Sequence, residues 1–309
     1  MSNQKHRILV YLANGVQGGA VAREAARRGF AVTALVRDRA AGANLAQAGI
    51  DPAHGDLADP SSLDAAHAGV TEIVLRMPIG PLDRVKGFAA NALAAARKAS
   101  VNMVVLKLAS ASRPAPCDEP SFVANSVIEA MVRSSGLPYA IVRPTMYLDN
   151  LLKPGVRQEV AVDGVFQVPI DISQRIAWTS ADDCAAAAMT LIENKTSGGD
   201  YLISGPDSVD GAELTAALSV GLGWKVIYRS EPLDDFEREV EAVMGAGEGK
   251  RVASKFRFFQ DYKDEADAIL ARPYVPQPGL EGFCPSSIEH WARRHVNAFT
   301  EMPQQVSAR

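Results

Sequence analysis

Closely spaced glycines follow the first apolar run of the chain. After residues 7–12 the sequence reads Ala13-Asn14-Gly15-Val16-Gln17-Gly18-Gly19, and a helical pattern begins at once. Glycine lets the backbone reverse tightly and approach a ligand with no side chain in between. Unpaired N–H groups at the positive end of the helix then suit phosphate oxygens. We expect a diphosphate to be held here by Ala13, Asn14, Gly15, Val16, Gln17 and Gly18, with a purely structural turn as the alternative.

An arginine stands at the end of the second apolar run. Arg37 follows Ala34-Leu35-Val36, at the strand tip that faces the adenosine ribose in dinucleotide-binding folds. A guanidinium there can pair with a 2′-phosphate and stack on adenine, which favours NADP(H). The neighbouring Asp38 keeps NAD(H) open, and a solvated surface arginine is the other interpretation. Further on, Asp56 and Leu57 follow a third short run, and the carboxylate could accept from the adenine amino group.

The first half of the chain alternates short apolar runs with longer amphipathic stretches, which is typical of a parallel sheet covered by helices. We expect strands over residues 7–12, 31–36, 50–54, 72–76, 102–108 and 139–142. Helices are expected over residues 17–28, 39–48, 60–67, 83–99 and 121–134. The fold class is therefore α/β, a doubly wound parallel sheet of the Rossmann type.

The pattern changes in the second half. Short strands are predicted over residues 165–168, 175–178 and 201–203, and helices over residues 182–193, 211–222, 232–244 and 248–262. This mixture predicts a smaller α+β lobe that binds the substrate. We place the nucleotide-binding domain at residues 1–150 and the C-terminal lobe, which should not fold independently, at residues 151–309.

Composition excludes several classes of function. The 309 residues are 47% hydrophobic and carry a formal net charge of −4, which argues against nucleic acid or an anionic membrane as the main partner. No apolar run reaches the length of a membrane span. The spacing of the cysteines Cys117, Cys184 and Cys284 matches no metal motif, so we expect no metal site. Because the N-terminus leads straight into a strand, we expect no signal peptide and a cytoplasmic protein.

Taken together, the chain resembles the NmrA-like family of atypical short-chain dehydrogenase/reductases over about residues 7–225. The residues that carry the likeness are Gly15-Val16-Gln17-Gly18-Gly19, Ala34-Leu35-Val36-Arg37, Gly55-Asp56-Leu57, the run from Glu129 to Tyr139, and Ile141-Val142-Arg143-Pro144. The resemblance implies a bound nicotinamide dinucleotide. It also implies either a reductase acting on a small carbonyl, quinone or activated double bond, or a protein that only senses the nicotinamide ratio.

Three departures from the family pattern bear on chemistry. Leu12 stands where the phosphate loop usually begins with glycine, and its side chain should crowd the turn. Asn125 replaces the lysine of many reducing relatives, and Ser121 replaces the tyrosine of classical relatives, so the usual proton donor and its helper are both missing. The fifth strand ends in Leu106-Lys107-Leu108, where serines are common.

The resemblance also suggests which residues surround the nicotinamide. Lys107 lies at a strand end beside it and could donate a proton or hold a substrate oxyanion; equally, its stem could pack while its head reaches solvent. Asn125 could orient a water or a substrate carbonyl, or be an inert helix residue. The resemblance implies that Met77 and Pro78, next to Arg76, flank the nicotinamide ribose, with a simple strand stop as the alternative. Tyr147 and Asn150 follow the break at Arg143-Pro144 and could line the substrate pocket, although a core position fits Tyr147 equally well.

Several functions fit this set of residues. The favoured one is an NADP(H)-dependent oxidoreductase that lacks the usual Tyr/Lys pair. The alternatives are a non-catalytic sensor of the nicotinamide ratio, an isomerase or epimerase on the same fold, and a protein that has lost the cofactor because of Leu12. A homodimer or a protein partner is compatible with each of them.

Overall fold

The computed structural model describes residues 6–38, 45–46 and 48–301. The chain divides into two compact units. Unit 1 comprises Met1–Pro144, Ala181–Ile203 and Val275–Cys284, and unit 2 comprises Thr145–Ser180, Ser204–Tyr274 and Pro285–Arg309. The predicted helix over residues 39–48 lies mostly outside the described residues, although Leu45 and Ala46 are helical.

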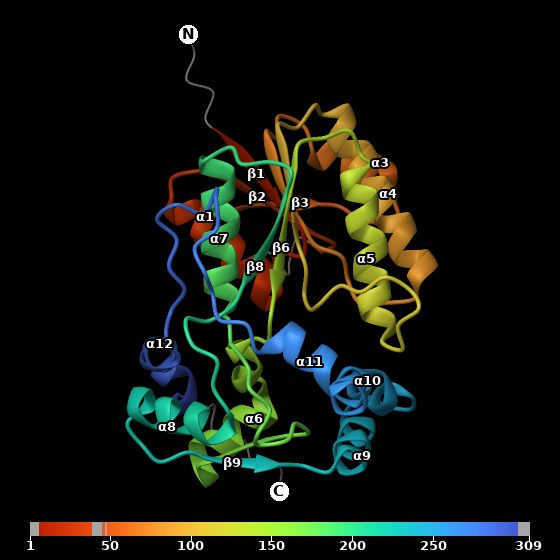
Figure 1. Cartoon of the computed structure of the whole chain (residues 1–309). Coiled ribbons are helices and arrows are strands. Elements are labelled where there is room, and N and C mark those ends of the chain that lie inside the picture. The colour runs from red at the N-terminus through yellow and green to blue at the C-terminus, as the bar shows by residue number, and fades with distance from the viewer. Residues whose placement is uncertain (1–5, 39–44, 47, 302–309) are drawn as a thin grey trace, which may run out of the picture. The chain divides into compact units, whose positions relative to one another are not determined.

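Unit 1 is built on a seven-stranded sheet in the order β3-β2-β1-β4-β5-β6-β8, and every neighbouring pair is parallel (Figure 1). Its strands are β1 (Arg7–Val10), β2 (Ala31–Val36), β3 (Asp51–His54), β4 (Glu72–Leu75), β5 (Met103–Lys107), β6 (Tyr139–Pro144) and β8 (Gly199–Ile203). The central strands are apolar at successive positions because helices cover both of their faces. Ile8, Leu9 and Val10, for example, are all 0% exposed. The predicted Rossmann-like fold class is confirmed.

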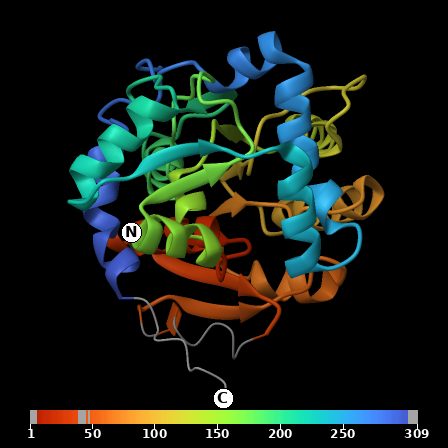
Figure 2. The ribbon, with the colours of Figure 1, turned by 90° about the horizontal axis from the view of Figure 1, so that it is seen from below.

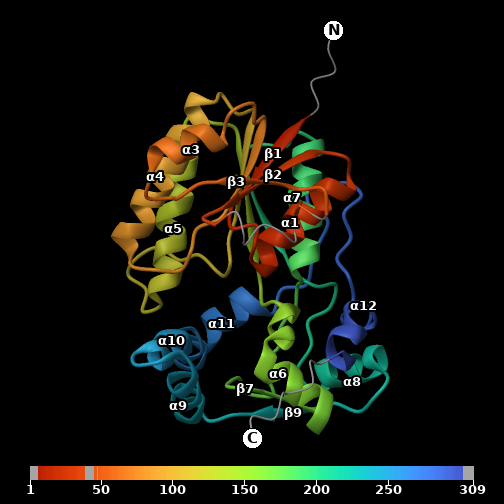
Figure 3. The same cartoon turned by 180° about the vertical axis from the view of Figure 1, so that it is seen from behind.

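Helices cover the two faces of this sheet. Figure 3 shows α1 (Val16–Arg27) and α7 (Ala181–Glu193) together on one face. The other face carries α3 (Pro60–Ala66), α4 (Leu82–Lys98) and α5 (Pro120–Arg133). Both α3 and α5 begin with proline after an acidic N-cap residue, Asp59 or Glu119, whose side chain accepts from a backbone N–H of the first turn.

Unit 2 is mainly helical around a two-stranded parallel sheet, β7 (Val165–Val168) and β9 (Ile227–Ser230), which Figure 2 shows as neighbouring arrows pointing the same way. Three short helical segments precede β7: η2 (Leu148–Leu152), α6 (Pro154–Gln158) and η3 (Glu159–Asp163). The longer helices are α8 (Gly211–Leu222), α9 (Leu233–Met244), α10 (Glu248–Asp261), α11 (Lys263–Leu270) and α12 (Ile288–Thr300). The sequence pattern did not predict β9, α11 or α12.

Two segments differ from the sequence prediction. The predicted strand over residues 175–178 is wrong, because Ile176 makes an isolated bridge to Val209 and the next N–H, of Ala177, donates to Leu270 O. Burial explains the apolar composition of this segment without a strand. The predicted single boundary at residue 150 also differs from the observed units, because β8 pairs with β6 and α7 packs on α1, which returns Ala181–Ile203 to unit 1.

A buried tyrosine–histidine pair supports the end of β1. His67 Nδ1 lies 2.7 Å from Leu63 O, so this nitrogen carries the proton, and Nε2 can accept from the Tyr11 hydroxyl at 3.3 Å. Burial lowers the pKa of His67, because the charged imidazolium is poorly solvated there. The folded protein therefore favours neutral His67.

This pair predicts a loss of stability in acid. An unfolded histidine titrates near about 6.5, so below that pH the unfolded chain binds a proton that folded His67 resists. We expect the free energy of unfolding to fall as the pH drops from about 7.5 to about 5.5. In His67→Gln, which keeps a side-chain oxygen to accept from Tyr11, the fall should be smaller. Urea unfolding at several pH values measures this, and an equal fall in both proteins would exclude His67 as a cause.

Candidate functional site

The turn after β1 contains a leucine with an unusual backbone conformation. Leu12 has a φ of 52°, in the left-handed region that glycine adopts at little cost. Its carbonyl oxygen accepts from Gly15 N at 3.1 Å, and its side chain packs against the hydrophobic core of the sheet. The leucine side chain therefore does not crowd the turn as predicted, because it points toward the hydrophobic core.

The lack of a side chain has a different role at Gly18 and at Gly15. A Cβ on Gly18 would lie 2.2 Å from Leu12 O and 2.7 Å from Leu12 C, so the close approach of α1 to the end of β1 itself requires glycine there. A Cβ on Gly15 would come no closer than 3.5 Å to Leu12 O, and its φ of −90° suits any residue. The fold does not require Gly15 to lack a side chain. Its absence keeps the backbone open at the start of α1, where first-turn N–H groups have no partner within the helix.

Lys107 is buried against this turn. It ends β5, is 1% exposed, and its Nζ donates to Gln17 Oε1 at 3.0 Å. The interpretation in which its head reaches solvent is wrong. A positive charge next to the N-terminus of a helix favours a nearby anion. The hydrogen bond to Gln17 therefore places a cationic side chain beside the turn where a diphosphate is predicted to bind.

The adenosine-side candidates lie at the ends of β2 and β3, which are neighbours in the sheet. Arg37 is exposed, and its carbonyl oxygen accepts from His54 Nδ1 at 2.9 Å. Asp56 Oδ1 accepts from Ala58 N at 2.8 Å, so one oxygen of this carboxylate stabilises the turn that contains Asp56. Leu57 is 7% exposed and belongs to the hydrophobic core of the sheet.

The residues after β4 lie at the same edge of the sheet. Arg76, Met77 and Pro78 are half-buried, and Met77 packs against the core. Ile79 is 63% exposed, and so is Val16 at 61% on the turn after β1. Because β1 pairs with β2 and β4, and β4 with β5, the carboxyl ends of these strands form one edge, where ligands bind in open α/β sheets.

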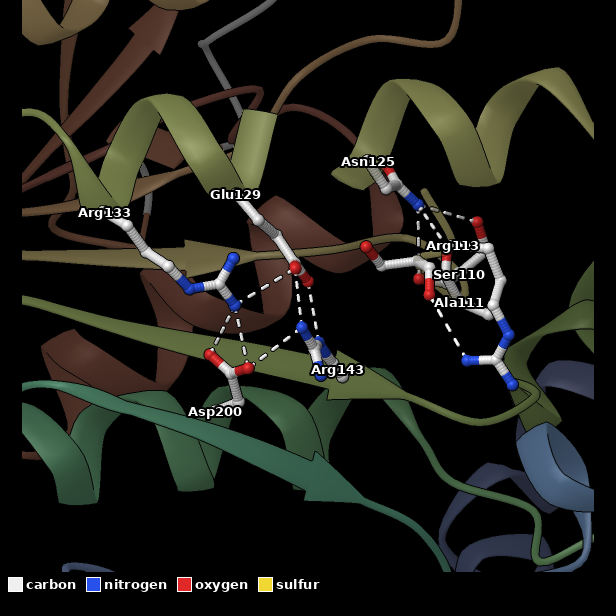
Figure 4. Close-up of polar contacts among 9 residues, drawn as sticks. Ser110, Ala111, Arg113, Asn125, Glu129, Arg133, Arg143 and Asp200 are labelled. Atoms are coloured by element: carbon white, nitrogen blue, oxygen red, sulfur yellow. Dashed lines mark hydrogen bonds and ion pairs between the residues drawn. The ribbon is translucent and has the colours of Figure 1, made fainter. Parts of the chain in front are cut away.

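Asn125 links α5 to the loop after β5 through hydrogen bonds. Its Nδ2 donates to Ala111 O at 2.7 Å, and it also lies 3.3 Å from Ser110 O and 3.2 Å from Ser110 Oγ (Figure 4). The amide nitrogen is therefore engaged by this loop. A direct role of Asn125 in orienting a substrate remains a prediction.

Sequence reasoning missed a buried acid at the start of α5. Glu119 is 2% exposed, and its Oε1 accepts from the Ser121 hydroxyl and from Ser121 N. Its Oε2 is buried and has no hydrogen-bond partner among the residues that the structure describes. Glu119-Pro120 is a helix-start signal that could have indicated the cap, but not the burial. A carboxyl group bonded to a hydroxyl can pass a proton through it.

A second buried acid, Glu129 of α5, connects this helix to the sheet through ion pairs. Glu129 is 2% exposed and binds Arg143 of β6 through two contacts of 2.7 and 2.6 Å (Figure 4). Arg133 lies 3.2 Å from the same carboxylate and 2.8 Å from Asp200 of β8. Hydrogen bonding to Glu129 raises the pKa of Arg143, so the guanidinium stays charged. This network fastens α5 to the two strands that complete the sheet.

The two substrate-side candidates belong to unit 2. Tyr147 is 5% exposed and bridges to Thr179, and its carbonyl oxygen accepts from the half-buried Asn150 N at 3.2 Å. Their place at a substrate pocket remains a prediction. In the described part of the chain, no group of acidic, histidine and cysteine residues is arranged to hold a metal ion. Nor does any helix within the described ranges have the length and apolar character needed to cross a bilayer.

Comparisons with known proteins agree with this fold. The chain is 29% identical over 304 residues to an NAD(P)H azoreductase of Xenophilus azovorans, across 94% of this chain and 99% of that protein. It is 30% identical over 309 residues, with the same coverage, to the (4-alkanoyl-5-oxo-2,5-dihydrofuran-3-yl)methyl phosphate reductase of Streptomyces griseus.

Solved structures and a family model extend the likeness. The structure of the Citrobacter sp. triphenylmethane reductase complexed with NADP(H) superposes with a TM-score of 0.72 at 20% identity, covering 94% of this chain and 99% of that one, which supports the fold alone. The model of the NmrA-like family matches residues 4–294, nearly the whole length. The chain therefore belongs to the NmrA-like family.

Proposed function

We propose that this protein is an NADP(H)-dependent reductase of a small organic substrate. The observation that carries the proposal is the buried Lys107 ammonium, bonded to Gln17 of the glycine turn. A cationic side chain beside a helix N-terminus favours the binding of an anion, and a dinucleotide diphosphate is such an anion. Relatives named as NAD(P)H azoreductase and as a phosphate-ester reductase support redox chemistry of this class.

Each part of the site has a role in this proposal. Backbone N–H groups between Ala13 and Gly18, apart from Gly15 N, which donates to Leu12 O, hold the diphosphate, and Lys107 neutralises part of its charge. Arg37 pairs with the 2′-phosphate, while Asp56 and the core residue Leu57 bound the adenine side. The ribose next to the nicotinamide lies against Arg76, Met77 and Pro78. When bound, the reduced cofactor supplies a hydride.

The proton in this proposal comes from residues of unit 1. Ser121 stands at the position of the family's tyrosine, and its hydroxyl is held by Glu119. We assign proton delivery to the Ser121 hydroxyl, which gives its proton to the reduced substrate and takes one from water, while Glu119 orients this hydroxyl and Lys107 has a neighbouring electrostatic role. Asn125 positions the loop after β5. This division explains how a chain without the usual Tyr/Lys pair could still reduce a substrate.

Titration with each cofactor tests the proposal. We expect NADPH to bind more tightly than NADH, as followed by nicotinamide fluorescence. Arg37→Ser should weaken NADPH about ten- to hundredfold, because it loses a charge-assisted contact with the 2′-phosphate, and should leave NADH nearly unchanged. Arg27→Ser, at an exposed arginine at the other end of α1, is the matched control. If neither cofactor binds the wild-type protein, the proposal fails.

A sensor of the nicotinamide ratio is the second candidate, favoured by Asn125 and Ser121 at the positions of the usual catalytic pair. A measurement of turnover distinguishes the sensor from the reductase. Oxidation of NADPH in the presence of an azo dye or a quinone identifies a reductase. Tight NADPH binding without oxidation by any such acceptor identifies a binding protein.

A further inference from the structure

An exposed histidine, His54, ends β3 and is held beside Arg37 of the neighbouring strand. In the register of the parallel strands β2 and β3, His54 lies opposite Val36, the residue before Arg37. Gly55 N donates to Val36 O at 3.0 Å, so the backbone on the far side of His54 is also fixed to β2. His54 Nδ1 lies 2.9 Å from Arg37 O. The imidazole is therefore fixed at the same edge of the sheet as the guanidinium-bearing residue.

The contact with Arg37 fixes the tautomer of His54. A carbonyl oxygen can only accept, so Nδ1 carries the proton and donates to Arg37 O. Nε2 of the neutral ring is then an acceptor, and it has no hydrogen-bond partner among the residues that the structure describes. A second proton on the ring would make Nε2 a donor and leave the bond from Nδ1 in place. The ring can therefore become a cation without losing its contact with Arg37.

Carboxylates near His54 are engaged elsewhere. Asp59 caps α3 and accepts from both the N–H and the hydroxyl of Ser61. These hydrogen bonds lower the pKa of Asp59, and the nearby charge of His54 has a smaller effect in the same direction. Within the described residues, the charged side chains of β2, β3, α3 and the adjoining turns are Arg37, Asp38, Asp51, Asp56, Asp59 and Asp64. Asp51 lies 3.8 Å from Arg7, and Asp64 pairs with Lys98.

We propose that His54 is a second cationic group for the 2′-phosphate of NADP(H), and that it takes up a proton from solvent when this phosphate binds. The inference rests on the proposed function, in which the adenosine end of the cofactor lies at the tip of β2. A phosphate monoester carries about two negative charges above about pH 7, whereas Arg37 supplies one positive charge. Protonated His54 supplies the second, and its Nε2–H donates to a phosphate oxygen. NADH has no 2′-phosphate and offers the ring no such anion.

The alternative is a structural histidine that only ties β3 to β2. His54→Asn separates the two roles, because its amide N–H can take the place of Nδ1–H and keep the bond to Arg37 O. The asparagine has no group in the position of Nε2 and gains no charge. A structural role would therefore survive this substitution, whereas a contact with the 2′-phosphate would be lost.

Calorimetry of the full-length protein tests the proposal, with NADPH and NADH as ligands in two buffers of different ionisation enthalpy. At about pH 7.5 the free 2′-phosphate is already largely ionised, so proton uptake reports on the protein. We expect NADPH binding to take up a fraction of a proton, at most about one, and NADH binding to take up none. The preference for NADPH over NADH should fall several-fold from about pH 7 to about pH 9, because an uncharged histidine no longer attracts the phosphate.

Variants assign the proton to one residue. His54→Asn should weaken NADPH about three- to tenfold at about pH 7, remove most of the proton uptake and leave NADH unchanged. His290→Asn makes the same change at an exposed histidine on α12 of unit 2 and should behave like the wild type.

Three results would overturn the role of His54. These are equal proton uptake with NADPH and NADH in the wild type, unchanged NADPH binding and proton uptake in His54→Asn, and an equal loss of affinity for both cofactors in that variant. If Arg37→Ser weakens NADPH while His54→Asn does not, the role of His54 is wrong but the proposed cofactor site stands. If the wild type binds no NADPH, both are wrong.

Discussion

Gly18→Ala is expected to destabilise unit 1 severely and to abolish NADPH binding. The new Cβ would lie 2.2 Å from the backbone oxygen of Leu12, and neither backbone segment can move without displacing α1 from β1. We expect a loss of about 3 kcal/mol or more in the free energy of unfolding, seen as a fall in Tm of roughly 5–10 °C. Thermal and urea unfolding measure this effect directly.

Two other glycines are the matched comparisons for Gly18. Gly87→Ala lies inside α4 with nothing within 4 Å of the new Cβ, so it should be neutral or stabilising by up to about 1 kcal/mol. Gly15→Ala should cost the fold about 1 kcal/mol as an N-cap change, yet weaken NADPH about tenfold or more by placing a methyl group in the phosphate cradle. If Gly15→Ala binds NADPH like the wild type, the diphosphate does not lie against this turn.

Lys107→Met is expected to weaken NADPH binding more than it lowers stability. Methionine keeps most of the volume of lysine but removes its charge and its hydrogen bond to Gln17, so some loss of stability is also expected. NADPH binding should weaken about ten- to hundredfold, because the diphosphate loses a charge-assisted contact in a poorly solvated place. Comparing Tm with the dissociation constant of NADPH separates the two effects.

The control for this substitution is the same chemical change at a surface lysine of unit 1. Lys98 lies at the end of α4, its side chain is 72% exposed, and it pairs with Asp64. Lys98→Met should leave NADPH affinity unchanged and alter stability only slightly. If Lys107→Met destabilises the fold strongly and binds NADPH normally, Lys107 is a structural residue, and the main support for the proposed cofactor site is lost.

Much of unit 1 could be predicted from local patterns. Apolar runs such as residues 7–10 and 31–36 are buried on both faces, and this composition is typical of the inner strands of a parallel sheet. The glycine turn and Arg37 were placed correctly at strand ends, because strand–turn–helix order is local in the chain. The strand predicted over residues 175–178 was wrong because an apolar run also fits buried irregular backbone.

The sequence by itself determined the α/β class, the parallel sheet and the family, since these follow from periodicity and from motifs of a few neighbouring residues. Only the tertiary structure decided that Lys107 contacts Gln17, 90 positions away, that Leu12 packs into the core, and that Glu119 buries an oxygen with no hydrogen-bond partner among the described residues. Burial and pairing depend on segments brought together by the sheet, and no local pattern records which segments those are. The chemistry of the proposed cofactor site rests on such a long-range contact.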